Sequence, residues 1–264
     1  LLGQTMTRVA RGGGRRRQSV AESSFDAWTK FYKQDANAAN AIVSYYAKGS
    51  LIALALDLKL RSETDGQVSL DDVMQAAWQR WGESPDGMPE DGLELLCAKV
   101  SGLDLDNFLD AAVRGTGELP LEKLLRTHGI ELHQRRATGG KDKGGKPAAD
   151  GKAPEAWLGA SVGGDADKAV FQVVHNGGPA ERAGIAPGDE LVALDGLRIK
   201  AGSTDERARR YKPGDHSDVT VFRGDELISL RLRWAKAPAD TCYLLVDDEA
   251  DEDAALRRAA WLGR

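Results

Sequence analysis

Apolar residues follow two different patterns along the 264 residues of this chain. Up to about residue 136 they recur at helical spacing, and between residues 40 and 61 they are dense enough for a helix with most of its circumference buried. Further helices are predicted over residues 70–81, 91–100, 104–113 and 121–128. The first half of the chain is therefore predicted to be an all-α bundle.

Local signals mark the ends of two of these helices. Ser69 and Asp72 have the spacing of a capping box at the start of residues 70–81, and Gly82 stands where that helix should stop. Gly129 is placed to end the helix over residues 121–128. The capping residues therefore support the helical interpretation independently of hydrophobic periodicity.

After about residue 154 the pattern changes to short apolar runs separated by turn residues. These runs predict strands over residues 168–175, 190–194, 219–222 and 227–234. A short helical turn closed by Gly184 and a polar, arginine-rich helix over residues 203–211 lie between them. This part is predicted to be a small β-barrel, so the fold class is multidomain α + β.

Composition divides the rest of the chain. Residues 137–153 are rich in glycine and lysine without apolar periodicity, which is typical of a flexible linker. The predicted regions are a helical part at 1–136, the linker at 137–153, the β domain at 154–237 and an acidic tail at 238–264, which ends in a short amphipathic stretch.

Charge and hydropathy exclude some classes of function. The net charge of −5 argues against a nucleic-acid binder. No apolar run approaches the roughly 20 residues that a membrane-spanning helix needs. Cys97 and Cys242 fall in different predicted regions, so a disulfide framework is not expected and the compartment stays undetermined.

Three glycine turns in the β domain agree in order and spacing. They read WLGA at residues 157–160, GGPAERAGI at 177–185 and PGDELV at 187–192. This pattern resembles a PDZ domain of the bacterial, protease-associated kind. The resemblance implies a groove between the strand after Leu158 and the helix at 203–210, where a peptide or protein C-terminus adds as an extra strand.

The residue types in the first turn suit that role. Glycine permits the dihedrals that let successive backbone amides point at one anion, so the amides near Leu158, Gly159 and Ala160 are the candidate carboxylate-binding loop. The alternative is a β-barrel in which the glycines only form turns. Arg207, Arg209 and Arg210 on the groove helix either favour acidic peptides or form a solvated face.

A second resemblance rests on three segments of the sequence. QSVAESSFDAW at residues 18–28, VSYYAKG at 43–49 and RGTGELPL at 114–121 look like the glycyl aminopeptidase family of zinc metallopeptidases, which is of gluzincin type and often carries a C-terminal PDZ domain. The resemblance covers about residues 1–234. The chain looks like the C-terminal part of such a protein, and its start at Leu1 without methionine or a signal-peptide pattern also favours a fragment or a processed product.

The family's zinc ligands are not recognisable in this sequence. In the family a His-Glu-x-x-His helix supplies two ligands and the general base, because residues four apart share one helix face. No histidine of the chain begins such a motif; the histidines are His128, His133, His175 and His216. Zinc is therefore expected in the parent protein but not in this chain.

One catalytic residue is implied by the family resemblance. The Tyr-x-Lys-Gly motif corresponds here to Tyr46-Ala47-Lys48-Gly49, and it implies that the Tyr46 hydroxyl stabilises the oxyanion formed at the scissile carbonyl. The alternative is that Tyr46 is a core aromatic. Tyr45 takes its place if the register is shifted by one, and Lys48 either orients a substrate carboxylate or extends along the helix to solvent.

Two functions follow from these patterns. The first is the C-terminal portion of a zinc-dependent aminopeptidase that acts on peptide substrates with a small N-terminal residue such as glycine, with the PDZ domain binding peptide C-termini. The second is a non-catalytic interaction protein in which a helical scaffold carries the PDZ module. Both predict that this chain alone hydrolyses little or nothing, because it lacks the metal that would activate water.

Overall fold

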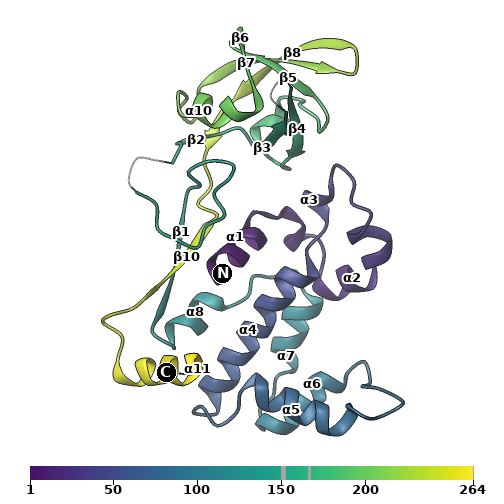
Figure 1. The fold of residues 1–264 in the computed structure, drawn as a ribbon, viewed down its shortest axis with the longest axis vertical. Helices are drawn as coiled ribbons and strands as arrows, with labels where there is room; N and C mark the ends of the chain where they lie inside the picture. The colour runs from purple at the N-terminus through teal and green to yellow at the C-terminus, as the bar shows by residue number, and fades with distance from the viewer. Residues whose placement is uncertain (150–152, 166–167, 264) are drawn as a thin grey trace. The chain divides into compact units, whose positions relative to one another are not determined.

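The computed structural model describes residues 1–149, 153–165 and 168–263 (Figure 1). Contacts within the chain divide it into two compact units. We call them the β unit, which comprises Leu1–Arg17, Asp26–Val43 and Gln134–Tyr243, and the helical unit, which comprises Gln18–Phe25, Ser44–His133 and Leu244–Arg264. The combination of a helical region with a β-sheet domain confirms the predicted α + β class.

Short and medium helices make up most of the helical unit. They are α2 (Val20–Phe25), α4 (Tyr45–Glu63), α5 (Leu70–Trp81), α6 (Gly92–Ser101), α7 (Asp106–Leu109), the π-helical η3 (Asp110–Arg114), α8 (Leu121–Arg126) and α11 (Glu252–Leu262). A buried cluster lies where α4 to α7 meet, formed by Leu56, Leu60, Val73, Leu96, Cys97, Leu105 and Leu109. Burial of one face of each helix holds this bundle together.

The capping box predicted at the start of α5 is present. The Asp72 carboxylate accepts the Ser69 N–H at 2.8 Å, and the Ser69 hydroxyl accepts the Asp72 N–H at 3.4 Å. The Ser69 hydroxyl and N–H also lower the pKa of Asp72, because they donate hydrogen bonds to its ionised form. The observed bounds of α5 equal the predicted ones.

The single helix predicted over residues 40–61 is wrong at its N-terminal end. A separate α3 (Ala38–Ala41) comes first, and Ile42 has extended backbone. Ser44 then caps α4, since its hydroxyl accepts the Ala47 N–H at 3.2 Å. The chain at Ile42 also passes so close to Gly14 that a Cβ there would lie 2.2 Å from the Ile42 oxygen. The interruption of the helix at Ile42 therefore accompanies a contact with Gly14, which is distant in sequence and cannot be read from the local pattern.

One segment, Ala38–Glu63, has the length and mean hydropathy (1.3) of a helix that could cross a membrane. This qualifies the expectation that no stretch of the sequence is long and apolar enough. Core helices that cross no membrane pass the same test of length and hydropathy, and 44% of this apolar window is buried inside the structure.

The predicted acidic tail contains two ordered elements. Residues Thr241–Val246 form strand β10, and α11 follows with Asp251 as its cap. Arg257 and Arg258 of α11 donate to the oxygens of Thr127 and Gly129, each at 2.8 Å. The prediction of an acidic tail at 238–264 did not include strand β10, whereas the amphipathic stretch predicted near Trp261 is the observed α11.

His128, just after α8, is completely buried and is accompanied by the ring of Trp261 at 6.1 Å. Its Nδ1 lies 2.9 Å from the Leu124 oxygen, and among the described residues its Nε2 has no hydrogen-bond partner. Burial lowers the pKa of His128 because an imidazolium would be poorly solvated there, and Arg257 acts in the same direction. His128 is therefore neutral in the folded protein at neutral pH.

We expect the helical unit to lose stability in mild acid through His128. The unfolded chain binds a proton at the ordinary histidine pKa of about 6.5, whereas the folded chain does so only at lower pH. Stability is therefore complete above about pH 6.5 and falls by up to about 1.4 kcal/mol per pH unit below it. Urea unfolding at pH 7.5 and pH 5.5 should show a smaller loss for His128→Leu than for wild type. The exposed His216→Leu serves as control, and equal losses in all three proteins would contradict the assignment.

An antiparallel sheet of six strands forms most of the β unit, with strand order β3-β4-β5-β7-β8 and β6 paired to β5. The strands are β3 (Ala160–Gly164), β4 (Ala169–Val174), β5 (Glu190–Leu194), β6 (Leu197–Arg198), β7 (His216–Arg223) and β8 (Glu226–Arg233). Among the described residues, β3 pairs with β4 alone. Its other edge can accept a further strand.

Two short strand pairs and several helices complete this architecture. β2 (Ala156–Trp157) pairs with β9 (Ala235–Lys236), and β1 (Ile130–Arg135) pairs with β10. The helical elements are α1 (Leu2–Arg11), η1 (Gly13–Arg16), η2 (Ala27–Phe31), α3, α9 (Pro179–Arg182), η4 (Ala201–Ser203) and α10 (Thr204–Ala208). Strand β1 corrects the prediction that residues 1–136 are helical throughout.

The sheet encloses an apolar core that includes Phe171, Leu191, Val221 and Trp234. The Trp234 Nε1–H donates to the Ser217 hydroxyl at 2.6 Å, so burying the indole leaves no donor unpaired. Asp189, only 2% exposed, receives two hydrogen bonds from Arg223 at 2.8 and 2.7 Å. Burial alone would raise the pKa of Asp189, but the bonds from Arg223 and from a backbone N–H outweigh it and the pKa is lowered.

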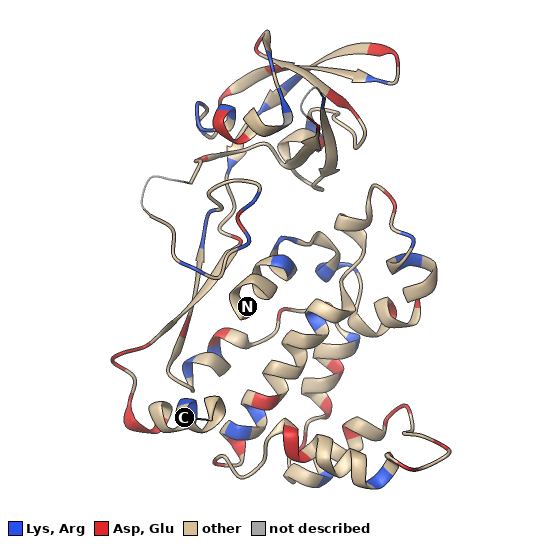
Figure 2. Cartoon of the chain, in the orientation of Figure 1, with Lys and Arg blue, Asp and Glu red and all other residues tan. Residues whose placement is uncertain are grey.

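Part of the predicted linker makes defined contacts. Asp142 is paired with Arg135 at 2.6 Å and accepts the Thr138 N–H at 2.9 Å, and these bonds hold its pKa well below the usual range. Residues 150–152 of the predicted linker lie outside the described residues. Acidic and basic side chains are interspersed over both units, in keeping with the small net charge of −5 (Figure 2).

Candidate peptide-binding groove

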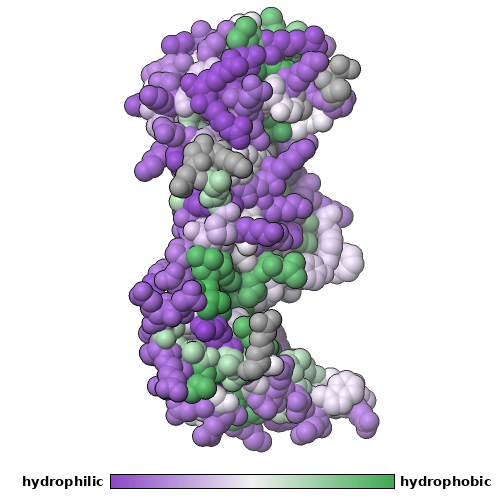
Figure 3. Space-filling model, turned by 60° about the vertical axis from the view of Figure 1, so that its left-hand side comes forward, coloured by the Kyte–Doolittle hydropathy of each residue, from purple (hydrophilic) through white to green (hydrophobic). Residues whose placement is uncertain are grey.

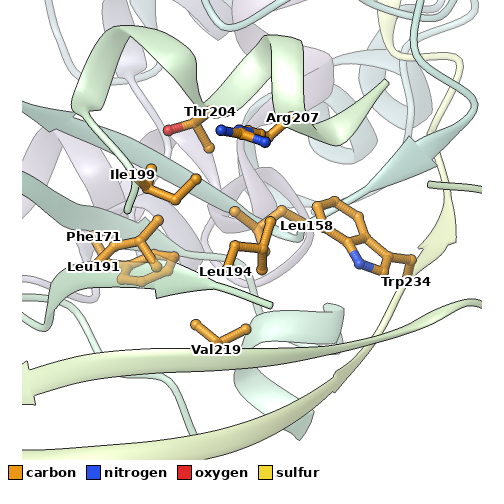
Figure 4. Close-up of a pocket in the computed structure, with 9 residues that line it drawn as sticks. All are labelled: Leu158, Phe171, Leu191, Leu194, Ile199, Thr204, Arg207, Val219 and Trp234. Carbon is orange, nitrogen blue, oxygen red and sulfur yellow. The ribbon is translucent and has the colours of Figure 1, made fainter. Parts of the chain in front are cut away.

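An apolar pocket lies between α10 and the sheet of the β unit (Figure 4). Thr204 and Arg207 come from α10 and cover one side of it. The rest of the lining is apolar and consists of Leu158, Phe171, Leu191, Leu194, Ile199, Val219 and Trp234. Most of the sheet-containing part of the chain is hydrophilic on the face that Figure 3 shows. An apolar lining favours contact with an apolar side chain over contact with a charged one.

The loop before β3 turns its carbonyl groups toward the protein. The Leu158 oxygen accepts the Ala180 N–H at 3.0 Å, and the Gly159 oxygen accepts the His175 N–H at 2.8 Å. Within the part of the chain that the structure describes, the N–H groups of Leu158 and Gly159 donate to no protein acceptor. Two backbone donors beside the pocket are therefore available to an anion.

Gly159 is needed for this conformation. Its φ is +78°, and a Cβ at this position would lie 2.6 Å from Cδ of Pro179 and 3.0 Å from Cα of Gly178. Any larger residue would combine left-handed backbone with a steric clash. The loop can therefore keep its shape only with glycine here.

Ala160 supplies a third donor at the free edge of β3. It is paired with Val174 of β4, and the adjoining hydrogen bond runs from His175 N–H to Gly159 O. In an antiparallel ladder that arrangement makes Ala160 and Val174 a non-hydrogen-bonded pair, so the Ala160 N–H points away from β4. The structure thus brings together the three residues that the sequence indicated as the loop, and it leaves their role as a prediction.

Helix α10 is shorter than the helix predicted over residues 203–211, because it ends at Ala208 after the 3-10 turn η4. Both its ends are anchored. Asp205 accepts the Gly140 N–H at 2.8 Å, and Arg209 donates to the Thr138 oxygen at 2.8 Å. Tyr211, just beyond it, stacks on Trp234 with ring centroids 4.5 Å apart. Helix α10, which forms one wall of the pocket, is therefore held by residues that precede the sheet and, through Tyr211, by Trp234.

Sequence reasoning missed several lining residues. Ile199 follows the two-residue strand β6, too short to show a pattern. Leu232 of β8 is buried, and so is Trp234 two residues later. The alternation of inward-facing and outward-facing residues along this strand could therefore have predicted that Trp234 faces the core. Arg207 was named without deciding whether it faces the groove or solvent, and the structure places it in the pocket lining.

Tyr46 lies in the first turn of α4 and is 59% exposed. The alternative that it is a core aromatic is therefore wrong, while a catalytic role stays a prediction. Its ring lies 4.2 Å from the ring of Tyr45, which is half-buried. Lys48 is only 2% exposed, so its side chain does not extend to solvent.

No group of three or more His, Cys, Asp or Glu side chains that could hold a metal ion occurs among the described residues. His133 lies 2.7 Å from Glu131, and His128 is enclosed in the helical unit. These residues do not fit the ligand set of a catalytic zinc ion, which takes three protein ligands.

Comparison with known proteins identifies both parts of the chain. Residues 156–233 match the model of the PDZ domain, so the groove belongs to a domain of the peptide-binding PDZ class. Residues 1–52 match the model of the M61 glycyl aminopeptidase, a family of zinc peptidases. The chain is therefore part of an M61 aminopeptidase-family protein that carries a PDZ domain.

A solved structure supports this membership over nearly the whole chain. The aminopeptidase N family protein from Idiomarina loihiensis is 36% identical, with a TM-score of 0.90, and the match covers 99% of this chain and 43% of that protein. This chain thus spans less than half the length of that relative. A search of curated proteins finds no match.

Two proteases show a more limited likeness. The HtrA-type protease AlgW with decapeptide is 25% identical at a TM-score of 0.30, with 32% of this chain and 30% of that one covered. A serine endoprotease from Yersinia pestis is 20% identical at a TM-score of 0.30, with 34% and 32% covered. At these scores neither likeness adds to what the PDZ match shows.

Proposed function

We propose that this chain binds peptide C-termini in the groove between β3 and α10, as the C-terminal portion of a zinc-dependent aminopeptidase that acts on peptides with small N-terminal residues such as glycine. The observation that carries the binding role is the set of three backbone donors, at Leu158, Gly159 and Ala160, beside an apolar pocket. A C-terminal residue with a free carboxylate and an apolar side chain matches the donors and the pocket, respectively.

The binding mode follows from the geometry of β3. The peptide adds as a strand at the free edge of β3, where main-chain hydrogen bonds supply affinity that does not depend on sequence. Its terminal carboxylate accepts hydrogen bonds from the loop N–H groups. Its last side chain enters the pocket beneath Thr204 and Arg207. Leu158 contributes to both, since its N–H faces the carboxylate and its side chain lines the pocket.

A comparison of free and amidated peptides tests this mode. We expect a fluorescent peptide with a free C-terminal carboxylate and an apolar last residue to bind, and its C-terminal amide to bind at least about tenfold more weakly, because hydrogen bonds to a charged acceptor are lost. Fluorescence anisotropy titration measures both. Equal affinity of the two peptides would show that the amides do not hold a carboxylate.

Tyr46 is the residue of this chain that we assign to catalysis. Its exposure on the first turn of α4 supports this role, because an oxyanion donor must be reachable by substrate. In this proposal the zinc ligands lie in the part of the parent protein outside this chain. This chain contributes the hydroxyl donor and the PDZ groove.

A further inference from the structure

Three arginines on or just after α10 differ in their partners. Arg209 donates to the Thr138 oxygen at 2.8 Å, and Arg210 lies 3.7 Å from Glu206. The Arg207 side chain has no hydrogen bond or ion pair with any described residue, although it is partly buried and lines the pocket. Of these three side chains, Arg207 is therefore the one with no partner among the described residues, so all of its donors can serve a ligand.

The acidic residues of α10 do not compensate Arg207. Asp205 accepts the Gly140 N–H, and Glu206 pairs with Arg210. A guanidinium carries five N–H donors in a planar fork that matches a carboxylate. Figure 4 shows its nitrogens beside Thr204, over the apolar lining that a bound peptide would cover. Binding would remove water from Arg207, and an acidic ligand group would replace it.

The register of an added strand selects the position of that group. Side chains alternate across a strand, so residues two apart face the same side. With the last residue in the pocket, the residue before it faces away, and the residue two positions before the last faces the pocket side again. That side is walled by Thr204 and Arg207 of α10.

We propose that Arg207 makes the groove selective for peptides with Asp or Glu two residues before the C-terminal residue. This inference rests on the proposed binding of peptide C-termini and adds the chemistry of the ligand. Arg207 acts as a specificity-determining residue that pairs with the acidic side chain, while the loop amides hold the terminal carboxylate.

The test uses two pairs of peptides that differ only in Asp against Asn. One pair has the change two residues before the last, and the other has it one residue before the last. Wild type should prefer Asp about tenfold in the first pair and less than about twofold in the second. Arg207→Gln should reduce the first preference to below about twofold, whereas Arg210→Gln, whose native side chain is already paired with Glu206, should keep it.

Charge reversal gives a result that misfolding cannot produce. Arg207→Glu should turn the preference around, so that a peptide with Lys two residues before the last binds more tightly than its Asp counterpart. A wild-type protein that binds these peptides without preferring Asp, or an Arg207→Gln variant that keeps a tenfold preference, would overturn this inference alone. If wild type bound no peptide with a free carboxylate, the proposed function would fall and this inference with it.

Discussion

Replacing Gly159 with valine should weaken peptide binding at least about 100-fold, which corresponds to about 2.7 kcal/mol. The native φ of +78° is unfavourable for any residue with a Cβ, and the new atom would lie 2.6 Å from Pro179 Cδ. The loop must therefore move, and the amides of Leu158 and Gly159 would lose the arrangement in which we expect them to hold a carboxylate. Anisotropy titration with a free-carboxylate peptide measures the loss, and circular dichroism reports whether the domain stays folded.

Gly196→Val is the matched control. Gly196 has a similar φ of +72°, but an added Cβ there would meet no atom within 4 Å. The two variants therefore share the backbone strain, and only Gly159→Val adds the clash in the loop. We expect Gly196→Val to bind peptide within about threefold of wild type, since a surface change away from a site has a small effect. Unchanged peptide binding by Gly159→Val would show that this loop does not hold the carboxylate.

Changing Tyr46 to phenylalanine should lower kcat about 100-fold to 1,000-fold in the full-length protein, with little change in KM. The hydroxyl is expected to donate to charge that develops only in the transition state, and loss of one such donor costs about 2.7 to 4 kcal/mol of barrier. Hydrolysis of a chromogenic glycyl substrate, with and without a chelator, measures this. Peptide binding by the PDZ groove should be unaffected in the same variant.

Tyr45→Phe makes the same chemical change one residue away. The Tyr45 ring lies 4.2 Å from that of Tyr46, so each variant removes one hydroxyl from the same pair of neighbouring rings. We expect Tyr45→Phe to retain kcat within a few-fold. A wild-type kcat for Tyr46→Phe would disprove its role, and a loss confined to Tyr45→Phe would move the role to that residue. Absence of chelator-sensitive hydrolysis in wild type would leave peptide binding as the function.

The elements that sequence reasoning located best are those that local chemistry specifies. The capping pair Ser69 and Asp72 fixes the start of α5, and strand β5 spans the predicted residues 190–194. Pro179 and Gly184 likewise bracket α9. Turn glycines and capping side chains act through neighbours in the chain, so they are visible without the fold.

The elements that it missed depend on partners far away in sequence. Strand β1 lies in a region predicted as helical, and it forms because β10, more than 100 residues later, pairs with it. The break before α4 likewise accompanies the close approach of Ile42 to Gly14. Such contacts override local propensity, because pairing and packing contribute more than the intrinsic preference of a short segment.

The candidate site shows the same division. The sequence by itself indicated the loop at Leu158, Gly159 and Ala160, since glycine before a strand permits a turn whose backbone amides are free to point at a ligand. Only the tertiary structure decided that Ile199 and Trp234 complete the pocket, and that Arg209 reaches the distant Thr138 while the Arg207 side chain has no partner among the described residues. Partners and burial arise when distant segments meet, whereas the dihedral freedom of glycine is already present in the isolated chain.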